Sequence, residues 1–212
     1  IIAFKDNTLY GTSTIDVESG ICTAPGYRGA SKLSIYYGAS QTFSSSISDD
    51  SVSQIKIAAT PTLVGNTYPI YVAYKDSANS GGVSVQQLAS SGGTWQYVGG
   101  KGFNQGIANY ISLAVDYSGV PYVAYESTNQ LLAVKKYNST TSNWDSVGNA
   151  NISTNIATWI SITVDPTDNL PYVAYQESTF IRVKKYDGTV WNQVGSDLSN
   201  ISNNYGSYTT LI

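Results

Sequence analysis

Four acidic residues recur at similar places along the chain, and acids of this kind could in principle cut a glycosidic bond. Hydrolysis of such a bond needs two carboxylates that flank it. Here each acid follows its own copy of a repeated hydrophobic segment, so the pattern favours an architectural role or a repeated binding site over an asymmetric catalytic pair. The four acids are Asp6, Asp76, Glu126 and Glu177.

The composition argues against most other chemistry. The 212 residues include no histidine, which excludes a Ser-His-Asp triad and imidazole metal ligands. The formal net charge is -3, so the chain has no basic surface large enough to bind nucleic acid. We therefore predict a protein that is not an enzyme and that has no cofactor, no catalytic residue and no nucleic-acid partner.

An internal repeat organises the sequence. The segment Pro121–Tyr125 returns as Pro171–Tyr175, and an earlier copy lies at Tyr71–Tyr74. A degenerate fourth copy opens the chain at Ile1–Asp6. The full copies are about 50 residues apart, a period typical of repeat architectures in which each unit packs against its neighbours.

Each repeat contains four short segments that read as strands. In the third unit they fall at about 109–115, 121–126, 131–137 and 144–148, where β-branched and aromatic residues alternate between turn-rich pieces. The last strand of each unit carries a tryptophan three residues before a Val-Gly pair. These residues are Trp95, Trp144 and Trp191, and Phe43 takes the tryptophan place in the first copy.

Four antiparallel strands in a repeat of this length form the blade of a β-propeller. We predict an all-β chain with one propeller domain over residues 1–212. The preferred arrangement has four blades, in which a strand near 207–212 pairs with the opening strand and closes the ring. The alternative is a segment of a larger propeller. The blades are predicted at about 205–212 with 1–47, 48–104, 105–153 and 154–204.

The repeat resembles those of secreted microbial β-propellers. The shared pattern is Val-Asp followed by Pro-Tyr-Val-Ala-Tyr, then Val-Lys-Lys-Tyr-Asp-Gly, Trp and Val-Gly, and it is loosely similar to the kelch, tectonin-lectin and Asp-box groups. The resemblance implies a blade fold and leaves function open, because propellers host many functions. Sialidase-like propellers clamp a carboxylate with three arginines, whereas this chain has Arg28 and Arg182.

Two further turns could hold a metal. Asp116 and Asp165 follow first strands, and we expect each side chain to bond its own backbone in an Asx-type turn. Calcium is the alternative, because the run Asp165–Asn169 is rich in oxygen ligands. The run lacks a recognised loop spacing, so no metal site is assigned.

Low charge and abundant Tyr, Ser, Thr and Asn are typical of an extracellular or cell-surface protein. Three sequons, at Asn138, Asn151 and Asn200, are glycosylation candidates. The single cysteine, Cys22, is buried or forms an intermolecular bridge. It lies in a Gly-rich insertion between Asp6 and Lys32, which replaces a short turn and could contact a partner.

A rim of the propeller is the predicted ligand surface. Each first strand opens with an aromatic residue beside the recurring acid, and Gln54 is the exception. An aromatic face with a polar acceptor suits a sugar ring. We therefore predict a non-catalytic glycan-binding module; the alternatives are a structural or assembly subunit of a cell surface or fibre and, remotely, a glycoside hydrolase. The candidate ligand residues are Tyr110, Trp159, Tyr208, Asp6, Asp76, Glu126 and Glu177.

Overall fold

The computed structural model describes residues 47–48, 51–64, 67–89 and 93–198, together with the strand backbone of 2–6 and 32–36. Strands dominate this part of the chain, and one short 3-10 helix interrupts them. None of the described helical segments is long and apolar enough to span a membrane. The elements are β1 (Ile2–Asp6), β2 (Lys32–Tyr36), β3 (Val52–Ala59), β4 (Ile70–Asp76), η1 (Ser77–Asn79), β5 (Gly82–Leu88), β6 (Gln96–Tyr97), β7 (Asn109–Val115), β8 (Pro121–Glu126), β9 (Leu132–Asn138), β10 (Asn143–Ser146), β11 (Ala157–Val164), β12 (Pro171–Glu177), β13 (Phe180–Tyr186) and β14 (Trp191–Gln193).

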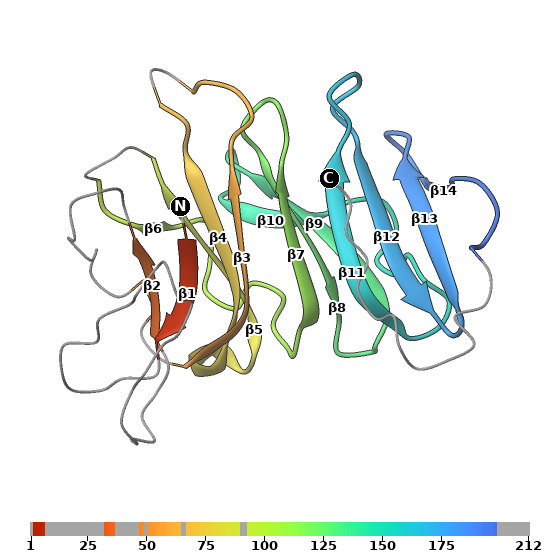
Figure 1. Ribbon diagram of the computed structural model, residues 1–212, viewed down its shortest axis with the longest axis horizontal. Coiled ribbons are helices and arrows are strands. Elements are labelled where there is room, and N and C mark those ends of the chain that lie inside the picture. The colour runs from red at the N-terminus through yellow and green to blue at the C-terminus, as the bar shows by residue number, and fades with distance from the viewer. Residues whose placement is uncertain are drawn as a thin grey trace, which may run out of the picture.

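Three four-stranded antiparallel sheets follow one another along the chain (Figure 1). We name them blade A (β3 to β6), blade B (β7 to β10) and blade C (β11 to β14). Within each blade, consecutive strands are hydrogen-bonded neighbours. The first strands β3, β7 and β11 lie beside one another, so the blades fan out from a shared inner edge. The predicted all-β chain of four-stranded units is confirmed at this level.

The opening copy of the repeat also forms strands. β1 pairs with β2 in antiparallel register, from Ile2 opposite Tyr36 to Asp6 opposite Lys32, and β1 lies next to β3 of blade A. The remainder of the first predicted blade lies outside the described residues. The same holds for the closing strand near 207–212, the insertion at 7–31 with Cys22 and Arg28, and Phe43. Ring closure within one chain therefore stays a prediction.

The repeated Tyr-Val-Ala-Tyr segment packs the blades together through its strand alternation. In β8, Val123 and Tyr125 face blade A, whereas Tyr122 and Ala124 face blade C. Alternate residues of a strand point to opposite faces of its sheet. A blade with apolar residues on both faces is stable only between neighbours, which explains why the segment recurs with each blade.

The recurring tryptophans and Val-Gly pairs join each blade to the next. The indole Nε1 of Trp144 donates to the carbonyl of Val98 at 2.8 Å, and that of Trp191 donates to the carbonyl of Val147 at 2.7 Å. The glycine after each valine has a positive φ, and a Cβ there would lie 3.0 Å from the indole. These two tryptophans therefore pack and hydrogen-bond each blade to the one before it. Among the described residues, buried Trp95 Nε1 has no acceptor.

Candidate functional site

Each of the three blades carries a β-bulge at the start of its first strand. The register of β3 with β4, of β7 with β8 and of β11 with β12 shifts at equivalent positions. Gln54, Tyr110 and Trp159 occupy these bulges with φ values of 53°, 50° and 52°. A left-handed backbone costs a non-glycine residue about 1 kcal/mol or more. Because this left-handed conformation recurs in three blades, we infer that the fold maintains it to keep the three side chains in one orientation.

The bulges border one pocket at the inner edge of the blades. Its volume is about 700 Å³, and all three blades contribute to its lining. Bulges commonly re-aim a side chain next to a functional site. The lining residues are Gln54, Ile55, Lys56, Asn109, Tyr110, Ile111, Glu126, Ile156, Thr158, Trp159 and Ile160.

Two aromatic rings form the apolar side of the pocket. The ring centroids of Tyr110 and Trp159 lie 5.2 Å apart at an interplanar angle of 58°. Both residues are half-buried, and exposed Ile156 lies on the same lining. Rings held in this way offer flat apolar surface together with the polar groups O–H and N–H.

A chain of polar side chains lies on the other side, and Gln54, Asn109 and Glu126 of this chain line the pocket. Asn109 Oδ1 accepts from Lys75 Nζ at 2.7 Å and from Gln54 Nε2 at 3.5 Å, while Asn109 Nδ2 donates to Glu126 Oε2 at 2.8 Å. The backbone N–H of Ile111 donates to Gln54 Oε1 at 3.1 Å. Gln54 of blade A therefore satisfies a backbone group at the bulge of blade B.

The recurring acids divide between two environments. When the repeated Tyr-Val-Ala-Tyr segments are aligned, Glu126 lies one position earlier than Asp76 and Glu177. Because alternate residues of a strand point to opposite faces, the side chain of Glu126 faces the pocket. Asp76 is buried inside the turn after β4. Its carboxylate accepts from Ala78 N at 3.1 Å, from Asn79 Nδ2 at 2.9 Å and from Ser84 Oγ at 2.6 Å. These bonds fix η1 and the turn.

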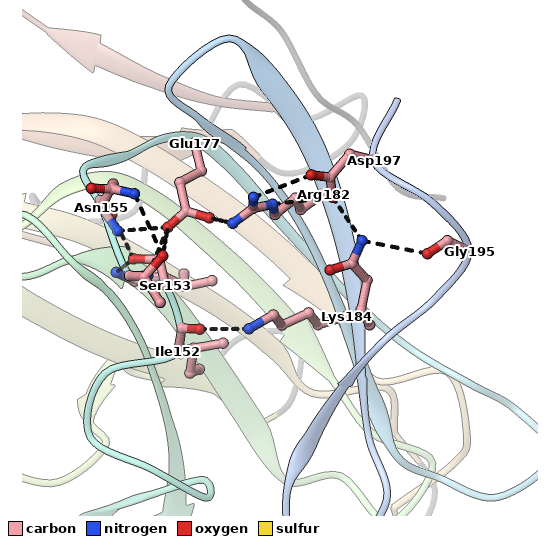
Figure 2. A network of polar contacts seen from close by, with 11 residues as sticks. Ile152, Ser153, Asn155, Glu177, Arg182, Lys184, Gly195 and Asp197 are labelled. Atoms are coloured by element: carbon pink, nitrogen blue, oxygen red, sulfur yellow. Dashed lines mark hydrogen bonds and ion pairs between the residues drawn. The ribbon is translucent and has the colours of Figure 1, made fainter. Parts of the chain in front are cut away.

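Glu177 occupies the corresponding turn of blade C, where Figure 2 shows it at the centre of a polar network. Its Oε1 accepts from the backbone N–H groups of Thr154 and Asn155, each at 2.6 Å, and Oε2 accepts from Arg182. Burial opposes ionisation, but these donors outweigh it and hold the pKa of Glu177 below its usual range. Arg182 Nε also pairs with Asp197 Oδ1 at 3.1 Å. The network therefore connects the segment before β11, blade C and the chain after β14.

The structure thus brings three of the predicted ligand residues together and separates two others from them. Tyr110, Trp159 and Glu126 line one pocket. Asp76 and Glu177 are engaged within their turns. Their ligand-binding roles stay predictions, as do those of Asp6, whose side chain is not described, and Tyr208, which lies outside the described residues. Nothing in the sequence singled out Asn109, which also lines the pocket, or Lys75, which donates to it.

The turns after the first strands have the predicted Asx geometry. Asp116 Oδ1 accepts from the backbone N–H of Ser118 at 2.9 Å and of Val120 at 2.8 Å. Asp165 Oδ1 accepts from the N–H of Thr167 at 2.9 Å, and Lys185 pairs with its other oxygen at 3.1 Å. Bonds from Thr167 and Lys185 lower the pKa of Asp165 to about 2. Within the described ranges, no group of three or more acids, cysteines or histidines could hold a metal ion.

The sequons differ in their surroundings. Asn138 donates to Asp145 at 2.7 Å and accepts from the N–H of Thr140 at 3.0 Å, so a glycan on its nitrogen would replace the bond to Asp145. Asn151 is exposed and accepts from Asn129 at 3.2 Å. Asn200 lies outside the described residues. Glycosylation at all three stays a prediction.

Comparison with known proteins identifies the fold. No protein-family model matches the chain, and no curated protein matches it in sequence. Among solved structures it is similar to crystal structures of AofleA from Arthrobotrys oligospora. A variant of AofleA with three arginines replaced by alanine is 14% identical at a TM-score of 0.51, and the match covers 81% of this chain and 53% of that chain. The unsubstituted protein is 13% identical at a TM-score of 0.51, with coverages of 81% and 52%.

The chain therefore spans about half the length of the structures it matches. At this identity the likeness shows the fold alone. The three sheets match part of a β-propeller, which agrees with their fan-like arrangement.

Proposed function

We propose that the chain is a non-catalytic glycan-binding module whose ligand occupies the pocket at the bulges. The observation that carries the proposal is the repeated left-handed bulge, which directs Gln54, Tyr110 and Trp159 to one pocket from three blades. Backbone strain held at equivalent positions is typical of sites where a side chain must keep one orientation.

The two sides of the pocket match the two kinds of surface on a sugar. The apolar C–H face of a pyranose ring stacks on an aromatic plate such as Trp159 or Tyr110. Its hydroxyls exchange hydrogen bonds with an amide or a carboxylate, and Asn109 and Glu126 of the lining supply one of each. Because Asn109 already bonds to Glu126 and to Lys75, both lining groups are oriented before a ligand arrives.

The fold comparison supports the same class of ligand, since AofleA is a β-propeller lectin. The absence of catalysis is supported by the carboxylates. Glu126 is the carboxylate among the described lining residues, whereas glycoside hydrolysis needs a flanking pair. An extracellular or cell-surface location stays a prediction.

A glycan array tests the proposal. The purified chain is expected to bind a coherent set of sugars, and Trp159→Ala is expected to weaken binding about fivefold or more, because loss of a stacking ring costs on the order of 1 kcal/mol or more. Tyr110→Ala should act in the same direction. Arrays run with and without calcium determine whether the ion contributes.

Tyr117→Ala is the matched control. Tyr117 is also an exposed aromatic, 40% accessible, but it lies in the turn at the opposite end of β7. This variant should bind like the unsubstituted chain. A blank array from folded protein, or equal losses in Trp159→Ala and Tyr117→Ala, would remove the support for a glycan site at the bulges.

A further inference from the structure

The second strand of each blade places one side chain at an equivalent position near its end. These residues are Lys75, Glu126 and Gln176, and each lies opposite a residue at the start of the first strand of its own blade. A cation, an anion and a neutral amide therefore occupy the same place in blades A, B and C. This difference in charge distinguishes the two junctions between the blades.

The junction between blades A and B is closed by the side chains of the protein itself. Lys75 lies two residues after Ala73, which packs against blade B, so strand alternation directs Lys75 to the same side. Its Nζ donates to Asn109 Oδ1 at 2.7 Å. Gln54 also donates to this oxygen and accepts from the N–H of Ile111. The polar groups of this junction therefore satisfy one another.

The junction between blades B and C has the same positions but different residues. Glu126 takes the place of Lys75, two residues after Ala124, which faces blade C. Thr158 takes the place of Asn109 in the strand register. Both Glu126 and Thr158 line the pocket, and no bond joins them in the described part of the chain. This junction therefore leaves an acceptor and a hydroxyl open to a ligand.

Glu126 has bonding capacity that the described residues do not use. The residue is 6% exposed, and its Oε2 accepts from the neutral amide of Asn109 at 2.8 Å. None of the ion pairs between described residues includes Glu126. The equivalent Gln176, by contrast, donates to the carbonyl of Ser178 in its own turn at 3.1 Å. A buried carboxylate with one neutral donor favours a ligand that brings a positive charge.

Two aromatic rings stand beside this open acceptor. Tyr110 follows Asn109 and Trp159 follows Thr158 in the bulges of blades B and C, and the ring centroids lie 5.2 Å apart. The face of an aromatic ring attracts a cation within about 6 Å of its centroid. A buried carboxylate, a hydroxyl and two rings together provide the contacts that an ammonium group uses.

We propose that the ligand is an amino sugar whose protonated amine binds between Glu126 and Thr158. The amine would take the place at this junction that the ammonium of Lys75 takes between blades A and B. The sugar ring would stack on Trp159 or Tyr110. This inference rests on the proposed glycan site and names the chemical class of its ligand.

The other charged lining residue limits the charge of the ligand. Lys56 is exposed on β3 of blade A, whereas Glu126 and Thr158 belong to blades B and C. Because like charges repel, a second cationic group beside Lys56 would weaken binding. The pocket therefore favours one amine on an otherwise neutral sugar over a polycation.

Calorimetric titration with matched sugars tests the proposal. The probes are the methyl glycosides of glucosamine and galactosamine, each compared with its N-acetylated form at pH 6, where the sugar amine is protonated. We expect at least one of the two amines to bind about tenfold or more tightly than its N-acetylated form, because charge-assisted hydrogen bonds are about twice as strong as neutral ones.

Isosteric variants assign the preference to the two residues. Glu126→Gln can still accept from Asn109 but removes the charge, so the preference for the amine should fall to less than about twofold. Thr158→Val removes the hydroxyl and should weaken binding of the amine about threefold. Circular dichroism melts establish that both variants are folded.

Two control variants separate local contacts from net charge. Asp145→Asn also removes one negative charge, but Asp145 is exposed on β10, the outer strand of the blade that carries Glu126. The preference for the amine should be unchanged in this variant. Lys56→Ala should leave binding of the amine equal or stronger, whereas it would weaken binding of an anionic ligand.

The outcomes distinguish this inference from the proposed function. Equal binding of the amines and the N-acetylated sugars, with loss in Trp159→Ala, would overturn the amine and leave the glycan site in place. A preference that persists in folded Glu126→Gln would also overturn it. If no glycan binds to the folded chain, the glycan site and the amine proposal fall together.

Discussion

Trp144→Ala is expected to lower the free energy of unfolding by about 4 kcal/mol, the range found for removal of a buried large aromatic. Trp144 is 7% exposed and packs on Phe103, Tyr137 and the backbone of Gly99. The substitution would open a cavity between blades A and B and leave the carbonyl of Val98 without its indole donor. Urea denaturation followed by circular dichroism measures the change.

Trp144→Phe separates the ring from its hydrogen bond. The phenyl ring can still fill most of the space of the indole, so the expected loss is about 1 to 2 kcal/mol, mainly from the unpaired carbonyl. If Trp144→Ala costs less than about 1 kcal/mol, the tryptophan does not join the blades in the way described.

Alkaline pH is expected to destabilise the protein through its buried tyrosines. Burial is the largest cause that raises the pKa of Tyr71, Tyr122, Tyr125 and Tyr175, each to about 12. Burial also raises the pKa of Tyr74, which further bonds to Tyr97 and Gln86. These tyrosines belong to the repeated strand segment or its copies, so the effect accumulates over the blades.

The direction of the pH effect follows from proton linkage. The unfolded tyrosines lose their protons above pH 10, whereas the folded ones keep theirs, so the unfolded state binds fewer protons and stability falls as pH rises. The stabilising contribution is complete below pH 10 and is lost as pH rises through the folded pKa values. After allowance for solvent screening, we expect a loss of about 3 kcal/mol between pH 9 and 11, or about 10 °C in Tm.

Thermal unfolding at pH 7, 9, 10 and 11, with tyrosinate absorbance recorded in parallel, checks this expectation. Tyr125→Phe is the control, because burial is the cause of its raised pKa and no other group contributes. The variant should reduce the alkaline loss by about a fifth while changing the Tm at pH 7 little. A Tm that is constant from pH 9 to 11 would contradict the buried environment of these rings.

The strands and their packing could be predicted from sequence because they rest on local patterns. The third unit was expected at 109–115 and 121–126 for its first two strands, and β7 and β8 have these bounds. The Asx turns at Asp116 and Asp165 follow from the same local chemistry. The repeat makes each strand prediction more reliable, because the same segment can be compared in several copies.

The site could be predicted only in part because it depends on contacts between blades. Tyr110 and Trp159 were found from their equivalent positions, but nothing in a single strand indicates that Gln54 bonds to the backbone of the next blade. Strand alternation separates Glu126 from Asp76 and Glu177, although all three follow the same motif. A one-residue offset within the repeat was the signal that could have distinguished them.

The most direct test of the glycan site uses the four tryptophan indoles as probes within one sample. An ¹⁵N correlation spectrum shows one indole N–H signal for each tryptophan. On titration with the glycan that binds best on the array, the signal of Trp159 is expected to shift. The signals of Trp144 and Trp191, whose N–H groups are bonded to Val98 and Val147, should stay in place. A shift of Trp144 or Trp191 with Trp159 unchanged would place the ligand between the blades and contradict a binding site at the bulges.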